Sequence, residues 1–287
     1  FYSQRCRAIL TLEKAYQICR EITINHYENF PVASKFLPAD IRNHIYPVYA
    51  FARHADDLAD EEGDKKQLLE WREMLHQSVN GTPSHPIFIA LADTIQRFDL
   101  PVNLFDNLLT AFLQDLDKNR YKNMSELLNY CQHSANPVGR IVLQLYGFKN
   151  ETLFEYSDNI CTALQLTNFW QDVRIDIRKD RIYIPQNFME EHDIYEDSIV
   201  YNRYDENFEN LMAGLVRTTG EMFKKGIPLL GRVPTRLRLQ LKFTIMGGLR
   251  VLDKIRRLNY NVLNFRPVLN KGDWAQIALK SIIGNRY

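Results

Sequence analysis

The chain is poor in glycine, with 12 glycines in 287 residues. It contains many long amphipathic windows, and no segment alternates between apolar and polar residues over enough length to indicate a sheet. These absences argue against an all-β or doubly wound fold. No internal repeat, low-complexity tract or linker interrupts the pattern. We therefore expect a single all-α domain over residues 1–287.

Other absences exclude classes of function. The 36 basic and 35 acidic residues leave a formal net charge of +1, so there is no electrostatic signature of nucleic-acid binding. The four cysteines show no CxxC or metal spacing and are typical of reduced cysteines in a cytosolic protein. No apolar run approaches the roughly 18–20 residues of a membrane span, no signal peptide is visible, and no GxGxxG fingerprint indicates a dinucleotide site. We expect a cytoplasmic protein.

Capping residues and helix breakers predict the order of the helices. Pro137 and Gly139 should distort the helix that carries Tyr130, because proline removes an N–H donor and glycine adds backbone freedom. Asn150 and Asp273 should cap the helices that follow them. The expected helices cover residues 11–27, 39–61 (with Pro47 inside), 64–79, 86–98, 101–117, 123–147, 150–181, 204–230, 234–260 and 273 onward, with an extended segment at 182–185.

Residues 165–181, QLTNFWQDVRIDIRKDR, contain the most informative polar pattern. On a helix, Gln165, Asn168, Asp172 and Asp176 fall at i, i+3, i+7 and i+11, so they share one face. Two carboxylates one turn apart, preceded by a carboxamide, suit a hard divalent cation that takes further ligands from water and phosphate. The apolar residues between them indicate a buried helix whose carboxylates point into a cavity. The alternative is an exposed acidic face paired with neighbouring basic residues: Arg174, Arg178 and Lys179.

A second acidic strip lies upstream, where Asp56 and Asp60 are again one turn apart and Arg53 precedes Asp56 by one turn. Like charges four residues apart destabilise an isolated helix, and burial costs more. Metal ions between two facing helices would supply the compensating positive charge. Arg53 beside the carboxylates predicts an anionic ligand, most simply a diphosphate bridged by Mg²⁺.

Three motifs in this order resemble the squalene/phytoene synthase family, and the resemblance covers nearly the whole chain. The family's YAxxR motif matches residues 49–53, which precede Asp56, Asp57 and Asp60. The YCxxxAxxVG motif matches residues 130–139, and QLTNxxxDVxxDxxxxRxYxP matches residues 165–185. The resemblance implies the fold of the class I terpenoid (isoprenoid) synthases, an all-α helical bundle with a central active-site cavity.

The resemblance also implies roles for individual residues. Mg²⁺ ions, three in number, would be held by Asp56, Asp60, Asn168, Asp172 and Asp176. Contacts to the diphosphate or to the reaction intermediate would come from other matched positions: Tyr49, Arg53, Gln165 and Arg256. Tyr130 would lie over the reacting carbons and steer a carbocation, and together with the four aspartates it forms the implied catalytic set.

Departures from the family pattern narrow the branch. Gln171 replaces a usual arginine, and Gly247–Gly248 lies where many members carry a tyrosine. The chain most resembles the bacterial hydroxysqualene synthase branch of hopanoid biosynthesis, which takes presqualene diphosphate to hydroxysqualene. That branch implies diphosphate ionisation, cation rearrangement and capture of water, with Mg²⁺ and without NADPH.

Two alternatives remain open at this stage. One is head-to-head condensation of two farnesyl diphosphates, giving presqualene diphosphate, dehydrosqualene or a phytoene-type product. The other is a non-catalytic assembly factor of the same fold, which retention of the four aspartates disfavours. The expected partner is a prenyl diphosphate and not nucleic acid. Peripheral contact with the inner membrane is expected through basic residues near the C-terminus: Lys271, Lys280 and Arg286.

Overall fold

The computed structural model describes residues 11–25, 37–59 and 65–283. The chain divides into two compact units, residues 1–109 and 110–287, and each is described by itself. Within the described ranges the regular elements are helices, and strand-like pairing is confined to an isolated bridge between Arg120 and Ile182. The all-α expectation is confirmed, and the expectation of one domain stays a prediction.

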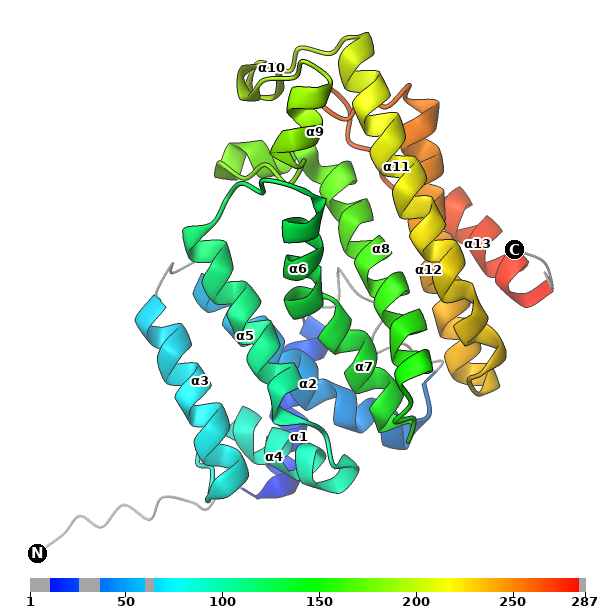
Figure 1. The fold of residues 1–287 in the computed structure, drawn as a ribbon. Coiled ribbons are helices and arrows are strands. Elements are labelled where there is room, and N and C mark those ends of the chain that lie inside the picture. The colour runs from blue at the N-terminus through cyan, green and yellow to red at the C-terminus, as the bar shows by residue number, and fades with distance from the viewer. Residues whose placement is uncertain (1–10, 26–36, 60–64, 284–287) are drawn as a thin grey trace, which may run out of the picture. The chain divides into compact units, whose positions relative to one another are not determined.

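The first unit contains four helices and the start of a fifth, which ends in the second unit (Figure 1). Helix α1 packs against α2 and α4, and α3 packs against α4. The predicted cap of the first helix is present, since Thr11 Oγ1 accepts a hydrogen bond from the backbone N–H of Lys14. The helices of this unit are α1 (Leu12–Asn25), α2 (Ala39–Asp57), α3 (Lys65–Asn80), α4 (Pro86–Phe98) and α5 (Val102–Asp117).

A polar cluster joins α1, α2 and α4 inside the first unit. The Tyr16 hydroxyl donates to Asp93 Oδ2 over 2.7 Å and lies 2.8 Å from His44 Nδ1 and 2.9 Å from Thr94 Oγ1. Burial raises the pKa of Tyr16 and lowers the pKa of His44, so both groups are neutral near pH 7. Three helices are thereby fixed by paired rather than orphaned polar groups.

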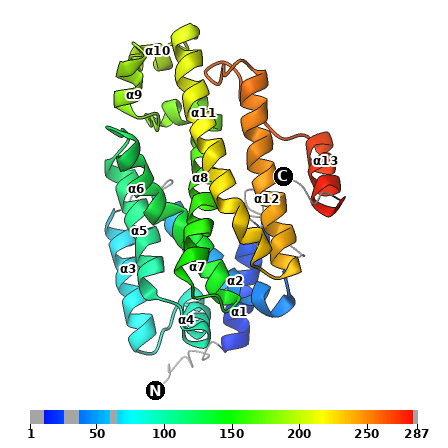
Figure 2. The ribbon, with the colours of Figure 1, turned by 45° about the vertical axis from the view of Figure 1, so that its right-hand side comes forward.

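The second unit is built around α8 (Glu151–Asp176), which packs against α6, α7, α11 and α12 (Figures 1 and 2). Helix α13 (Lys271–Ile283) packs on α12 and lies outside it in Figure 2. Helix α8 is followed by a 3-10 turn at Ile177–Lys179, and α11 by another at Ile227–Gly231. The remaining helices are α6 (Met124–Ser134), α7 (Asn136–Leu145), α9 (Gln186–Glu191), α10 (Glu196–Val200), α11 (Glu206–Gly226) and α12 (Thr235–Arg257).

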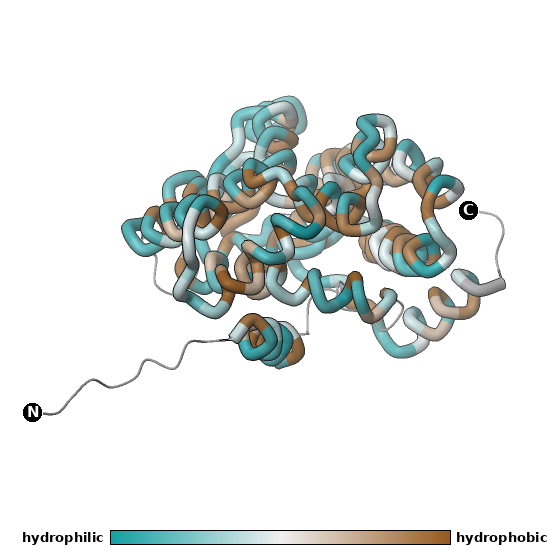
Figure 3. The backbone as a smooth tube through the Cα atoms, turned by 90° about the horizontal axis from the view of Figure 1, so that it is seen from below, coloured by the Kyte–Doolittle hydropathy of each residue, from teal (hydrophilic) through white to brown (hydrophobic). Residues whose placement is uncertain are grey.

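Helix α8 has buried apolar residues on several sides, whereas most other helices show one apolar and one polar side, visible as alternating brown and teal in Figure 3. Trp170 is fully buried in α8 and donates its indole N–H to Thr219 Oγ1 of α11 over 2.8 Å. A helix that is covered nearly all round holds its remaining polar residues in fixed positions.

The expected break near Pro137 and the cap at Asn150 are present, whereas the short helices α9 and α10 lie where no helix was expected. The helix that carries Tyr130 ends at Ser134, and α7 begins at Asn136, next to Pro137. Asn150 caps α8 by accepting from the N–H of Leu153 over 3.1 Å. The prediction that Asp273 caps the last helix is wrong.

The cap of α13 is Asn270, whose side chain accepts from the N–H of Asp273 over 2.9 Å. Asp273 Oδ2 accepts in return from the N–H of Asn270 over 2.8 Å. This is the reciprocal arrangement of a capping box, in which the residue three positions into the helix supports the cap. The cap therefore lies three residues earlier than the sequence suggested.

The adjacent glycines Gly247 and Gly248 of α12 differ in the space around them. A Cβ atom at Gly248 would lie 2.5 Å from the ring of Phe223 and 3.2 Å from Leu164, so α12 approaches α8 and α11 too closely for a side chain. A Cβ atom at Gly247 would meet Trp274 at 3.9 Å, an ordinary contact. Position 248 therefore has no room for a tyrosine, the residue that the resemblance led us to expect in this helix.

We expect Gly248→Ala to lower the free energy of unfolding by about 1–3 kcal/mol, because the added methyl group overpacks a rigid contact. Gly247→Ala is the matched control and should be neutral or stabilise by up to about 1 kcal/mol, since alanine is the better helix former. Urea denaturation of the purified variants measures both. Equal effects at the two positions would contradict the close approach at Gly248.

Candidate active site

The predicted polar strip lies on the C-terminal half of α8. Gln165, Asp172 and Asp176 are half-buried, whereas Asn168 is exposed. The interleaved residues Leu166, Phe169, Trp170 and Val173 are buried. The four polar side chains therefore lie beside buried apolar residues, although Arg174 and Ile175 of the same stretch are exposed. The helical spacing of the strip is as predicted.

Asp172 forms an ion pair with Arg266, a residue of the segment between α12 and α13. Arg266 Nε donates to Asp172 Oδ1 over 2.6 Å, and Nη2 donates to Oδ2 over 3.2 Å. The hydrogen bonds to Asp172 raise the pKa of Arg266. Sequence reasoning missed Arg266, because 94 positions separate it from Asp172 and no local pattern links them.

Asp176 lies one turn further along and carries a perturbed carboxyl group. Burial, followed by repulsion from Asp172, raises the pKa of Asp176 from its usual range to about 7. Arg181 and Lys179 act in the opposite direction but do not cancel the effect. A positive charge placed next to the strip would therefore stabilise the ionised form of Asp176 in particular.

Four aromatic side chains form a cluster next to the strip, which we call the aromatic cluster: Tyr121, Tyr130, Phe169 and Tyr183. The rings of Phe169 and Tyr183 stack with centroids 3.7 Å apart, and the ring of Tyr130 lies 6.0 Å from Phe169 and 5.8 Å from Tyr121. Burial, together with the nearby carboxylates of Asp115 and Asp176, raises the pKa of Tyr183. The cluster is therefore electrostatically coupled to the strip.

The hydroxyl group of Tyr130 donates to Asp115 Oδ2 over 2.9 Å. Tyr130 is only 5% exposed, and burial together with the charge of Asp115 raises its pKa far above the usual range. A phenol in this state keeps its proton and cannot serve as a base near neutral pH. Asp115, near the end of α5, was not predicted from the sequence.

The other predicted strip belongs to α2 in the first unit. Arg53 contacts two carboxylates of its own helix, Asp56 over 3.2 Å and Asp57 at close range. Tyr49 lies one turn earlier, and burial raises its pKa. Asp60 lies outside the described residues.

The structure places Arg256 on an exposed part of α12, with its guanidinium group facing Gly220 of α11. Arg266 forms an ion pair with Asp172 of the α8 strip. The predicted role of Arg256 in diphosphate binding stays a prediction. Two arginines ten residues apart, on a helix and on the loop after it, cannot be distinguished by charge pattern alone.

The strip fits a hard cation in its ligand chemistry, since it offers carboxylate and amide oxygens and no thiolate or imidazole. Among the described residues, no three His, Cys, Asp or Glu side chains gather closely enough to hold a metal ion by themselves. A cation on this strip would therefore need additional oxygen ligands. Water and a phosphate group supply such ligands to Mg²⁺ in many enzymes.

Comparison with known proteins identifies the family. A family model described as squalene/phytoene synthase matches residues 24–273. The chain belongs to this family. The resemblance drawn from the three motifs is thus confirmed.

Individual members of the family extend the comparison. A hydroxysqualene synthase of Rhodopseudomonas palustris is 32% identical over 236 residues, covering 80% of this chain and 79% of the relative. A phytoene synthase of Arthrospira platensis is 27% identical over 277 residues, covering 91% and 90%. The crystal structure of squalene synthase HpnC from Alicyclobacillus acidocaldarius matches with a TM-score of 0.84 and 38% identity, covering 87% of this chain and 96% of that one.

The raised pKa of Asp176 predicts how the metal-free protein responds to pH. A carboxyl group whose pKa is about 7 in the folded state and about 4 in the unfolded state contributes stability at low pH. That contribution is lost as the pH rises from about 4 to about 7. In EDTA, Asp176→Asn should therefore exceed the wild type by only about 1 kcal/mol at pH 5 and by about 4 kcal/mol at pH 8.

Urea denaturation at several pH values measures this difference. The control is Asp197→Asn, an exposed aspartate in the first turn of α10, which should leave the pH profile unchanged. A constant difference between Asp176→Asn and the wild type from pH 5 to pH 8 would contradict the raised pKa.

Proposed function

We propose that this chain is a hydroxysqualene synthase that converts presqualene diphosphate to hydroxysqualene. The observation that carries the proposal is the oxygen-rich strip of α8 beside the aromatic cluster of Tyr121, Tyr130, Phe169 and Tyr183. The carboxylate and amide oxygens of the strip can hold the Mg²⁺ that a leaving diphosphate needs. The aromatic faces of the cluster can stabilise the carbocation that remains. The relative in Rhodopseudomonas palustris named hydroxysqualene synthase supports the choice of reaction.

Departure of the diphosphate is the charge-separating step. We propose that Asn168, Asp172 and Asp176 hold Mg²⁺, together with Asp56 and Asp60 of the first acidic strip. When bound, Mg²⁺ neutralises negative charge that grows on the leaving oxygen, which is the dominant contribution in such ionisations. Four further contacts to the diphosphate are assigned to polar residues: Tyr49, Arg53, Gln165 and Arg256.

The carbocation that remains needs shielding and a single route to product. Aromatic faces stabilise a cation without reacting with it, and Tyr130 and Phe169 offer two such faces next to the strip. The Tyr130 hydroxyl stays protonated and bonded to Asp115, which fixes the ring. The diphosphate leaves with the electron pair of its C–O bond, and the cyclopropylcarbinyl cation rearranges. Water adds to the rearranged cation as one ring C–C bond breaks and a C=C bond forms, so that a new C–O bond is made and one proton is released. This balance requires no reductant, so NADPH is not needed.

The alternative within the family is condensation of two farnesyl diphosphates. The relative in Arthrospira platensis that is named phytoene synthase favours this reading at 27% identity. Both reactions begin with Mg²⁺-assisted ionisation of a prenyl diphosphate. They differ in the nucleophile that meets the cation, which is water in one and a second prenyl chain in the other.

The decisive test supplies presqualene diphosphate or farnesyl diphosphate separately in ¹⁸O-labelled water. Presqualene diphosphate with Mg²⁺ should yield a C30 alcohol that carries the label, and NADPH should change neither yield nor product. EDTA or Asp172→Ala should lower the rate by at least about 100-fold, because a metal ligand is lost. Products are identified by mass spectrometry.

Circular dichroism controls for the fold of Asp172→Ala. No turnover of presqualene diphosphate combined with condensation of farnesyl diphosphate would establish the alternative reaction. A hydrocarbon that forms only with NADPH would instead indicate reductive squalene synthesis.

We also propose that α13 and the segment before it touch a membrane surface from which a lipid substrate is taken. Within the described part of the chain, no helix has the length and apolarity that crossing a bilayer requires. The segment exposes Phe265, Val268 and Leu279 alongside Lys271 and Lys280. The only acidic residue of the sequence between 258 and 287 is Asp273, which is buried in ion pairs with Arg250 and Lys254. An apolar and basic surface suits anionic lipids.

Flotation with vesicles tests this contact. Vesicles containing anionic lipid should float the protein at low salt, and Leu279→Glu should reduce the floated fraction several-fold, because one apolar contact is replaced by a repelled charge. Val200→Glu, an exposed apolar residue of α10, is the matched control. Loss of flotation in the control alone would place the contact elsewhere.

A further inference from the structure

The segment that carries Arg266 is tied to α8 on both sides of Asp172, and we call residues 264–267 the strap. Arg174 Nη1 donates to the carbonyl oxygen of Asn264 over 2.7 Å. Gln171 Nε2 donates to the carbonyl oxygen of Pro267 over 2.5 Å. Both anchors hold the backbone of the strap, so the position of Arg266 is set by α8 itself.

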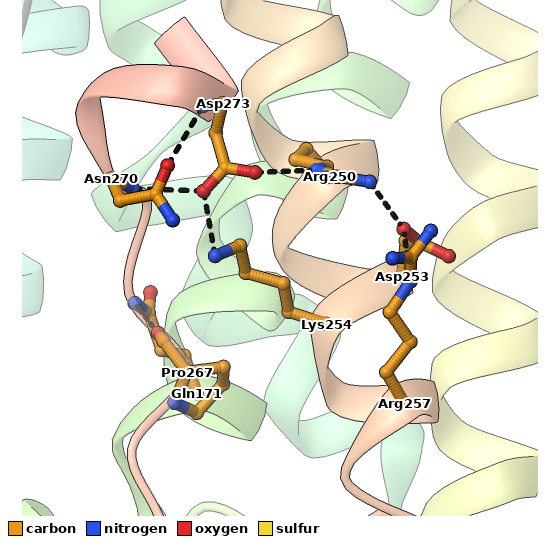
Figure 4. A network of polar contacts seen from close by, with 8 residues as sticks. All are labelled: Gln171, Arg250, Asp253, Lys254, Arg257, Pro267, Asn270 and Asp273. Atoms are coloured by element: carbon orange, nitrogen blue, oxygen red, sulfur yellow. Dashed lines mark hydrogen bonds and ion pairs between the residues drawn. The ribbon is translucent and has the colours of Figure 1, made fainter.

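The chain after the strap is tied to α12, as Figure 4 shows. Asp273, at the start of α13, accepts from Arg250 over 2.8 Å and from Lys254 over 2.6 Å. The ion pair with Lys254, the hydrogen bond from the backbone N–H of Asn270 and the ion pair with Arg250 lower the pKa of Asp273 well below its usual range. The strap is therefore held from two helices of the same unit.

This geometry leads to an inference that rests on the proposed Mg²⁺ site. We infer that Arg266 is a positioning residue that occupies Asp172 in the metal-free protein and must leave it before a divalent cation binds there. Gln171 and Arg174 place the strap so that the guanidinium group reaches the carboxylate. The ion pair is thus a built-in competitor of the metal.

A divalent cation that binds Asp172 must displace the guanidinium group of Arg266, because the two compete for the same carboxylate oxygens. The guanidinium group donates to both oxygens of Asp172, and its positive charge repels a cation on the same carboxylate. The pair is also partly exposed, with side-chain exposures of 43% for Arg266 and 26% for Asp172. Exposure limits the strength of the pair, so a divalent cation can win the competition.

A different role for Arg266 predicts the opposite sign. Outer partners of a metal-ligating carboxylate often orient it, and their removal typically weakens metal binding 10- to 100-fold. A competing partner has the reverse effect, because its removal frees the carboxylate. The direction of the change in metal affinity therefore decides between the two roles.

Gln171 is one of the positions at which this chain departs from the expected family pattern, in which an arginine precedes Asp172. A carboxamide at this position donates to the Pro267 carbonyl oxygen without adding charge beside Asp172. Replacement of Gln171 should loosen the strap and weaken the hold of Arg266 while the charge of the site stays constant. The strap thus gives the structural reason for a neutral residue at position 171.

Mn²⁺ binding in the presence of inorganic pyrophosphate, followed by the EPR signal of free Mn²⁺, tests the inference without turnover. Arg266→Ala should tighten Mn²⁺ binding about fivefold, the effect expected for loss of a partly exposed ion pair. Gln171→Ala should tighten binding by a smaller factor, and it should add nothing in the Arg266→Ala background, because both changes act through one contact.

Arg257→Ala is the matched control for charge, since Arg257 is an exposed arginine of α12 that pairs with Asp253. It should leave Mn²⁺ affinity unchanged. Unchanged or weakened binding in Arg266→Ala would overturn the competition, whereas the proposed metal site would stand. Absence of Mn²⁺ binding in both the wild type and Arg266→Ala would overturn the metal site and this inference with it.

Discussion

The second unit depends on keeping two carboxylates together at the end of its central helix, beside residues that are buried in the core. Asp172 and Asp176 lie one turn apart on α8, whose neighbouring residues are buried against four helices. Such a pair is stable only if positive charge or a proton is added. Both solutions are present: the guanidinium group of Arg266 lies on Asp172, and the pKa of Asp176 is raised towards neutrality. The loop after α12 supplies this positive charge, and its contacts with Gln171 and Arg174 hold Arg266 next to Asp172.

Much of the strip was predictable because its geometry is local. Helical spacing places Asn168, Asp172 and Asp176 on one face whatever the rest of the chain does, and caps such as Asn150 act within three residues. Arg266 was not predictable, since its partner is 94 positions away and any of several arginines satisfies the same charge pattern. Asp115 escaped for the same reason, because its contact with Tyr130 depends on how two helices pack.

Two departures from the family pattern have separate physical explanations. Gly248 is required by the ring of Phe223, which fills the space that a side chain at 248 would need. Gln171 donates to a backbone carbonyl group on the strap and adds no charge beside Asp172. The sequence alone shows only that the expected arginine and tyrosine are replaced at these two positions, and it does not show which contacts explain the replacement. Both contacts depend on how distant parts of the chain pack together. A sequence motif therefore does not reveal them.

The stack of Trp274 on Phe243 has a consequence for spectroscopy. The chain contains three tryptophans, of which Trp71 and Trp170 are 4% and 0% exposed, whereas Trp274 is 40% exposed on α13. Its ring lies parallel to Phe243 of α12, with centroids 5.5 Å apart. A collisional quencher in the solvent therefore reaches one indole far more readily than the other two. The emission that such a quencher removes is an intrinsic optical signal of whether α13 is seated on α12, available without a label.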